Sequence, residues 1–177
     1  FGIGLTTLVG LNLAVLCLIT ILLYWTMLKI GSAFSATAAI LVFLTVFAFA
    51  QMVAYGNYNY VTPYETNVTF GMLFCLAAIV GLVKFVETRS AAGASASGFF
   101  LGCAFLTKPE LFLAGACAWA GGIVLLAWMR GCDRRLILGT FVATPAAFLI
   151  APAISIALLA SKMSLEQAVL GTFGSWT

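Results

Sequence analysis

The sequence alternates between long apolar stretches and short polar segments. Six stretches contain no charged residue, and each is close to the roughly 20 residues that a helix needs to cross a bilayer. They cover residues 3–28, 33–55, 69–83, 90–107, 111–129 and 136–160. The pattern predicts an all-α fold, a polytopic transmembrane helix bundle of about six spans. Residues 1–177 are then part of a single transmembrane domain.

The polar segments between these stretches indicate how the chain is oriented. The segments after successive spans must alternate between the two sides of the membrane. Those after the first, third and fifth spans hold six basic residues, Lys29, Lys84, Arg89, Arg130, Arg134 and Arg135, and the others hold only Lys108 and Lys162. Because basic residues are enriched in cytoplasmic loops, we expect the first group inside the cell. Residue 1 and the tail 161–177 then lie outside.

Small residues distinguish the fourth and fifth spans. Gly98 and Gly102 have the GxxxG spacing, and Ala114, Ala118 and Gly122 repeat small side chains along the fifth span. In lipid, small residues allow helix backbones to approach closely. We therefore predict that both spans pack inside the bundle.

Two further local signals fall near the end of the chain. Pro145 and Pro152 lie within the sixth span and predict a kink, because proline removes a backbone donor from the helix. Ser164, followed three residues later by Gln167, is a capping-box pattern. It predicts a short helix in the tail, lying on the outer membrane surface.

The composition excludes several classes of function. Hydrophobic residues make up 64% of the 177 residues and charged residues only 7%, whereas soluble domains carry about 25% charged residues. These residues include no histidine, so His-ligated metals and Ser-His-Asp triads are excluded within them. A net charge of +3 does not fit nucleic-acid binding. The five cysteines lack CxxC spacing and are interpreted as structural.

The predicted outer side carries the polar residues that need an explanation. Lys108 and Glu110 flank Pro109 and interrupt an otherwise apolar stretch, although ionisable residues are costly in a membrane. One interpretation is a tight turn whose two charges reach the interface and partly neutralise each other. The other is a binding site, in which Lys108 contacts an anionic group such as a phosphate. Glu110 then holds the Lys108 side chain in place or contacts a polar substrate.

A second outer segment, residues 56–65, is rich in tyrosine and asparagine. It contains Asn59, Tyr60, Tyr64 and Glu65. Tyrosines gather at membrane interfaces because they are amphipathic, so an aromatic belt is one explanation. Aromatic faces combined with amides and a carboxylate also suit a polyhydroxylated ligand, which is the functional interpretation.

These two segments, Gly56 to Glu65 and Gly102 to Glu110, resemble the GT-C membrane glycosyltransferases. The likeness is to bacterial members related to protein O-mannosyltransferases and aminoarabinose transferases. It implies a GT-C-like membrane module that uses a polyprenyl-phosphate sugar donor at the outer face of the bacterial inner (plasma) membrane. In that family the catalytic acid lies in the first large outer loop, so we expect it upstream of Phe1. The sequence is then an internal part of a longer chain.

The resulting hypothesis is a membrane glycosyltransferase that moves a hexosyl or pentosyl group to an acceptor on the extracytoplasmic side. The acceptor, a lipid, glycan or protein, is not identified by the sequence. Lys108, Glu110, Glu65, Tyr60, Tyr64 and Asn59 are the candidate donor-phosphate or substrate-binding residues. No cofactor is evident, and a divalent cation, although compatible with such chemistry, has no support in the sequence. The expected partners are the lipid-linked donor and membrane lipids.

Two alternatives remain open. A polytopic transporter or lipid flippase would use Lys108 to Glu110 as a broken-helix substrate site. A purely structural membrane subunit would tolerate substitution of all the outer polar residues.

Overall fold

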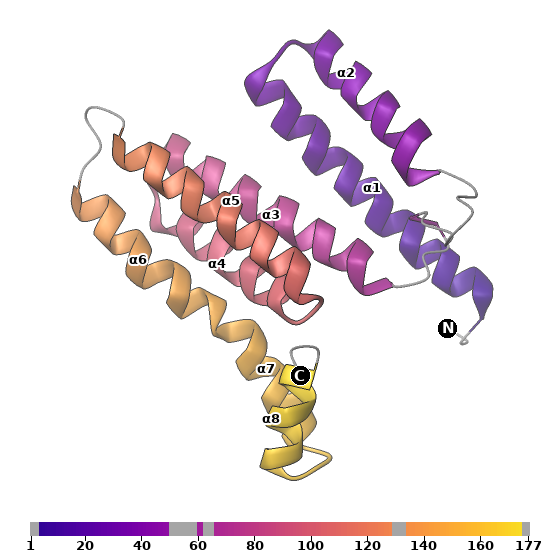
Figure 1. The fold of residues 1–177 in the computed structure, drawn as a ribbon, viewed down its shortest axis with the longest axis vertical. Coiled ribbons are helices and arrows are strands. Elements are labelled where there is room, and N and C mark those ends of the chain that lie inside the picture. The colour runs from indigo at the N-terminus through magenta and orange to yellow at the C-terminus, as the bar shows by residue number, and fades with distance from the viewer. Residues whose placement is uncertain (1–3, 50–59, 62–65, 129–133, 175–177) are drawn as a thin grey trace. The chain divides into compact units, whose positions relative to one another are not determined.

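The computed structural model describes residues 4–49, 60–61, 66–128 and 134–174, and the regular structure in these ranges is entirely helical (Figure 1). The helices in chain order are α1 (Leu5–Ile30), α2 (Ala33–Val42), the π-helix η1 (Phe43–Ala48), α3 (Thr66–Thr88), α4 (Ala91–Phe105), α5 (Pro109–Trp128), α6 (Arg134–Phe148), α7 (Ile150–Ala160) and α8 (Leu165–Phe173). The prediction of an all-α fold is confirmed for these residues.

Four helical stretches in the described part of the chain are long and apolar enough to cross a membrane. They are α1, α3, α5 and the stretch Leu138–Ala160, while Ala33–Ala48 and Ala91–Phe105 are apolar but shorter. Large apolar side chains also remain exposed, among them Phe34 at 84%, Trp128 at 80% and Ile30 at 77%. A water-soluble surface rarely exposes apolar side chains on this scale. The helices are compatible with a multi-pass integral membrane protein.

The described residues belong to two compact units, Phe1–Leu73 and Phe74–Thr177, and the boundary falls within α3. In the first unit, α1 and α2 form an antiparallel hairpin (Figure 1). Ser32 begins α2 as its N-cap, where its Oγ accepts a hydrogen bond from the N–H of Ser35 at 3.2 Å. The second apolar run was expected to extend to residue 55. Its described helical part ends at Ala48, and residues 50–55 lie outside the described ranges.

The second unit is built around α4, whose small residues bring its backbone close to α3. A Cβ added to Gly81 would meet the backbone N of Ser97 at 2.7 Å, and one added to Gly93 would meet that of Phe85 at 2.5 Å. Ser97 Oγ also donates a hydrogen bond to the carbonyl of Ala78 at 2.8 Å. Only glycine permits such separations, because any side chain would displace backbone atoms.

The other side of α4 packs against α6 in the same way. A Cβ on Gly98 would collide with the carbonyl oxygen of Thr144, and one on Gly102 with that of Phe148. Thr144 Oγ1 donates to the carbonyl of Ala94 at 3.3 Å. The GxxxG spacing therefore serves the contact between α4 and α6, and the prediction that the fourth span packs inside is confirmed.

The corresponding prediction for the fifth span is wrong at two of its three residues. Ala114 and Ala118 on α5 are exposed. The close contact is made instead by Gly115, where an added Cβ would lie 2.9 Å from Cys75 Sγ, and by Gly122, where it would lie 2.6 Å from Leu82 Cδ2. Most of α5 is exposed because only one narrow face of it packs against the rest of the second unit.

Successive helices of the second unit alternate in direction. Gly81 with Ser97 and Phe85 with Gly93 make α3 and α4 antiparallel, since one residue number rises as the other falls. The contacts from Gly98 and Gly102 to Thr144 and Phe148 make α4 and α6 parallel, and those of α5 make it parallel to α3. This alternation is what successive membrane crossings produce. Because α3 and α5 are parallel, their N-terminal ends lie at the same end of the second unit.

The two local signals near the end of the chain correspond to features of the structure. The sixth apolar run is interrupted at Leu149, between Pro145 in α6 and Pro152 in α7. Ser164 and Gln167 form both hydrogen bonds of a capping box at the start of α8, each 3.4 Å long. The predicted kink and tail helix are therefore present, and α8 packs against α7 through Ser155 and Thr172, whose hydroxyl oxygens lie 3.2 Å apart.

The contact between α4 and α6 can be tested with Gly98→Ala. We expect a loss of about 1–3 kcal/mol in the free energy of unfolding, because the new methyl group meets a backbone carbonyl that cannot move aside. Thermal unfolding of the purified protein in detergent, followed by circular dichroism, measures the change. Gly121→Ala on α5 is the matched control, since an added Cβ there meets nothing within 4 Å. Equal shifts in the two variants would contradict the packing role of Gly98.

Candidate functional site

The turn between α4 and α5 is a tight connection that carries Lys108. Thr107 closes the end of α4, where its N–H and its Oγ1 donate to the carbonyl of Ala104 at 3.0 and 2.6 Å. Pro109 then occupies the first position of α5, where a missing N–H has no cost. The carbonyl of Lys108 accepts from the N–H of Phe112 at 3.1 Å, which makes Lys108 the capping residue of α5.

Two of the predicted site residues meet at this turn. Lys108 is half-buried, and Glu110 is exposed in the first turn of α5. A helix N-terminus carries a partial positive charge that favours anions. The Glu110 carboxylate is stabilised there by the helix itself, and the Lys108 ammonium adds a full positive charge to the same end of the helix.

Four phenylalanine rings pack together next to this turn. Phe105 is the centre of this aromatic cluster, with its ring centroid 5.3 Å from that of Phe112, 5.5 Å from that of Phe148 and 5.7 Å from that of Phe173. All three pairs have the edge-to-face geometry that aromatic quadrupoles favour. The aromatic cluster joins α4, α5, α6 and α8. The turn that holds Lys108 therefore has an apolar surface beside it.

The charged residues near the end of α3 lie far from Lys108, at the opposite end of the second unit. Lys84 Nζ and Glu87 Oε2 are 3.6 Å apart in the last turns of α3. Arg89 follows with a φ of 54°, a left-handed conformation that ends the helix. Because α4 runs antiparallel to α3, its far end carries Lys108 away from these residues. The separation of the two groups of charges along the sequence is therefore also a separation in space.

Tyr60 lies in the first unit, where it is packed against the helical hairpin. Its N–H donates to the carbonyl of Ala48 at 3.0 Å, and its ring centroid lies 5.6 Å from that of Phe43 in an edge-to-face arrangement. The next residue, Val61, accepts a hydrogen bond from Nδ2 of Asn12 at 3.0 Å. Tyr60 is only half-buried, so part of its side chain stays accessible.

The predicted site residues are thus divided between the two units. Lys108 and Glu110 share one turn of the second unit, and Tyr60 belongs to the first. Asn59, Tyr64 and Glu65 lie outside the described residues.

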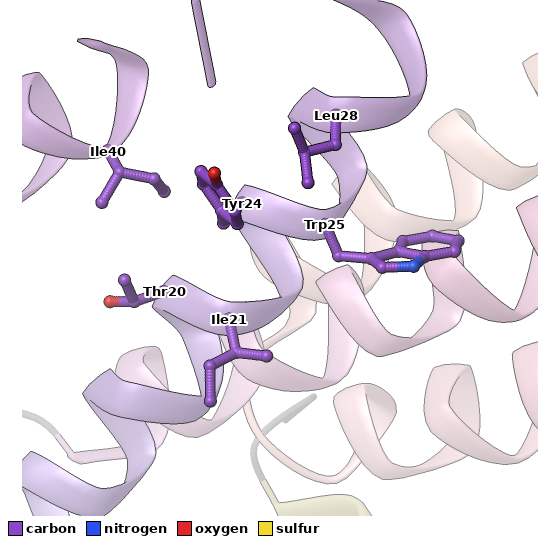
Figure 2. Close-up of a pocket in the computed structure, with 6 residues that line it drawn as sticks. All are labelled: Thr20, Ile21, Tyr24, Trp25, Leu28 and Ile40. Atoms are coloured by element: carbon purple, nitrogen blue, oxygen red, sulfur yellow. The ribbon is translucent and has the colours of Figure 1, made fainter. Parts of the chain in front are cut away.

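The first unit also contains an apolar groove of about 380 Å³ between α1 and α2 (Figure 2). It is lined by Thr20, Ile21, Tyr24, Trp25, Leu28 and Ile40. The hydroxyl of Thr20 donates to the carbonyl of Leu16 at 2.8 Å, so it is already satisfied within α1. The groove includes none of the predicted site residues, and its mainly apolar lining suits a hydrocarbon chain.

No group of three or more His, Cys, Asp or Glu side chains that could hold a metal ion occurs among the described residues. Comparisons with protein-family models, with curated proteins and with solved structures give no match for this chain. The functional interpretation therefore rests on the residues themselves.

Two features of the structure were not found by sequence reasoning. The aromatic cluster joins residues from four helices, and no local pattern distinguishes its members from the other phenylalanines of the chain. Asn12 did have a signal, because it is the only amide within the first apolar run. A polar residue in such a run is expected to need a partner, which here is 49 positions away.

The aromatic cluster can be tested with Phe105→Ala. We expect a loss of about 3–5 kcal/mol in the free energy of unfolding, because the ring contacts three others and leaves a cavity. Phe34→Ala is the control, since this ring is 84% exposed and its removal is expected to change stability by less than about 0.5 kcal/mol. Thermal unfolding in detergent measures both. Similar stabilities for the two variants would show that the cluster does not hold the turn.

Proposed function

We propose that the chain, with its about six predicted spans, is part of a membrane glycosyltransferase of the GT-C type. It transfers a sugar from a polyprenyl-phosphate donor to an acceptor at the outer face of a bacterial inner membrane. The observation that carries the proposal is Lys108, a half-buried cation at the first turn of α5 and at the end of the second unit opposite Lys84 and Arg89.

The surroundings of Lys108 support its assignment to the donor phosphate. The ammonium and the N-terminal end of α5 together attract an anion. The aromatic cluster beside the turn is apolar, as the neighbourhood of a lipid-linked substrate must be. A lysine at this place stabilises the negative charge that develops on the phosphate as the sugar departs.

The remaining residues have proposed roles at the sugar and the acceptor. Tyr60, Tyr64, Asn59 and Glu65 shape the site for the hydroxyl groups of either substrate, and Glu110 meets a polar group or positions Lys108. A carboxylate upstream of Phe1 acts as the general base, taking the proton from the acceptor hydroxyl as its oxygen attacks the anomeric carbon. This base belongs to the part of the enzyme that the resemblance places before the present residues.

A transporter or lipid flippase is the second candidate, and one observation favours it. The helix break at Leu149 adjoins Phe148, a member of the aromatic cluster next to the Lys108 turn. Broken helices of this kind line substrate paths in transporters. The two functions differ in product, because a flippase moves the lipid-linked sugar unchanged whereas a transferase releases the polyprenyl phosphate.

Lys108→Ala tests the assignment. We expect turnover of the full-length enzyme to fall on the order of 10²–10³-fold, the usual effect of removing one group that stabilises developing charge. The measurement is transfer of labelled mannose or aminoarabinose from its polyprenyl-phosphate carrier in membranes, normalised to the amount of inserted protein. Lys162→Ala, at the other predicted outer lysine, is the control and should retain activity. Unchanged turnover in Lys108→Ala would remove this residue from the mechanism.

A further inference from the structure

The starting observation is a fully buried amide in the first helix. Asn12 is 0% exposed and lies on the same face of α1 as Val15, Leu16 and Ile19. It is about 10 Å along the helix from Leu5, at the usual rise per residue. Burying an amide among apolar side chains is unfavourable unless its hydrogen bonds are made. If this position served packing alone, an apolar residue such as leucine would suffice. The presence of an amide here therefore needs another explanation.

The explanation is the segment against which Asn12 packs. Residues 60 and 61 are not helical, and yet they lie beside α1 at the depth of Asn12. Irregular backbone at membrane depth is tolerated only where the protein satisfies its polar groups. Nδ2 of Asn12 supplies the donor for the carbonyl of Val61 at 3.0 Å, while Oδ1 has no partner among the described residues.

A second contact holds the same segment from the other helix. The π-helix η1 ends at Ala48, which leaves the carbonyl of Ala48 without a helical partner. The N–H of Tyr60 donates to it at 3.0 Å, and the ring of Tyr60 packs against Phe43 in the first turn of η1. Tyr60 and Val61 are therefore fixed by one hydrogen bond to η1 and one to α1.

We propose that Asn12 is a positioning residue that sets the location of Tyr60 through the Val61 carbonyl. Tyr60 is the half-buried aromatic residue assigned above to the sugar or acceptor site, so this inference rests on the proposed function. Asn12 contacts no substrate in this account. It holds in place the backbone that presents Tyr60.

The test combines a structural readout with an activity readout in the full-length protein. Val61→Cys, in a parent whose native cysteines are replaced, reports how tightly the segment is held through its rate of labelling by a water-soluble maleimide. Asn12→Leu keeps the branching of the side chain at Cγ and leaves the helix apolar, but it removes the donor. We expect labelling to become about fivefold faster, the change that corresponds to losing one hydrogen bond between neutral groups. We also expect KM for the donor or for the acceptor, whichever Tyr60 contacts, to rise by a similar factor, with unchanged protein levels.

Two further variants separate positioning from general stability. Thr26→Val on the same helix is the matched control, because the Thr26 hydroxyl donates only to its own helix, to the carbonyl of Leu22 at 2.8 Å. It should leave both labelling and KM unchanged. Asn12→Gln retains the amide donor and should restore part of the protection from labelling and part of the lost affinity.

The possible outcomes are distinct. An unchanged labelling rate in Asn12→Leu overturns the proposal, whatever the activity. Faster labelling with an unchanged KM for both the donor and the acceptor also overturns it, because the anchor would then not position a substrate-binding residue. If the parent transfers neither mannose nor aminoarabinose from its polyprenyl-phosphate carrier, the proposed function fails. Faster labelling in Asn12→Leu would then still show that Asn12 anchors the segment.

Discussion

Close contact between helix backbones at the glycines of α4 is the interaction on which the second unit depends. Lipid removes most of the hydrophobic drive for helices to associate, so packing and short hydrogen bonds must hold them together. Gly93 faces α3 and Gly98 faces α6, while Ser97 bonds to the carbonyl of Ala78. With its 15 residues, α4 is about 22 Å long and buried along much of its length. Its end fixes where Lys108 lies.

Much of the fold could be predicted because its signals are local. Charge-free stretches predicted the helices, Ser164 and Gln167 predicted α8, and the prolines predicted the interruption at Leu149. The partners of each helix face could not be read in this way. Ala114 and Gly115 are equally small, yet only Gly115 lies against α3, because the rotation of α5 is set by contacts with Cys75 and Leu101.

The candidate site was predicted in part for the same reason. Lys108 and Glu110 are conspicuous in an apolar sequence, and the structure brings them to one turn between α4 and α5. The aromatic cluster beside them depends on four helices meeting, which no single stretch of sequence encodes. Asn12 was visible as a polar residue, but its role depends on the distant carbonyl of Val61. The sequence thus singles out Lys108, Glu110 and Asn12 as unusual residues, but it does not predict the contacts around them.

The central claim is that the Lys108 turn faces outward, while the basic connection between α3 and α4 faces the cytoplasm. Side-specific labelling of intact cells tests it most directly, with single cysteines introduced as Glu110→Cys and Ser90→Cys into a cysteine-free parent. Both native residues are exposed next to helix starts, so each cysteine is accessible from its own side of the membrane. The account predicts that a membrane-impermeant maleimide labels Glu110→Cys in intact cells and Ser90→Cys only after lysis. Labelling of Ser90→Cys in intact cells, or protection of Glu110→Cys, would contradict it.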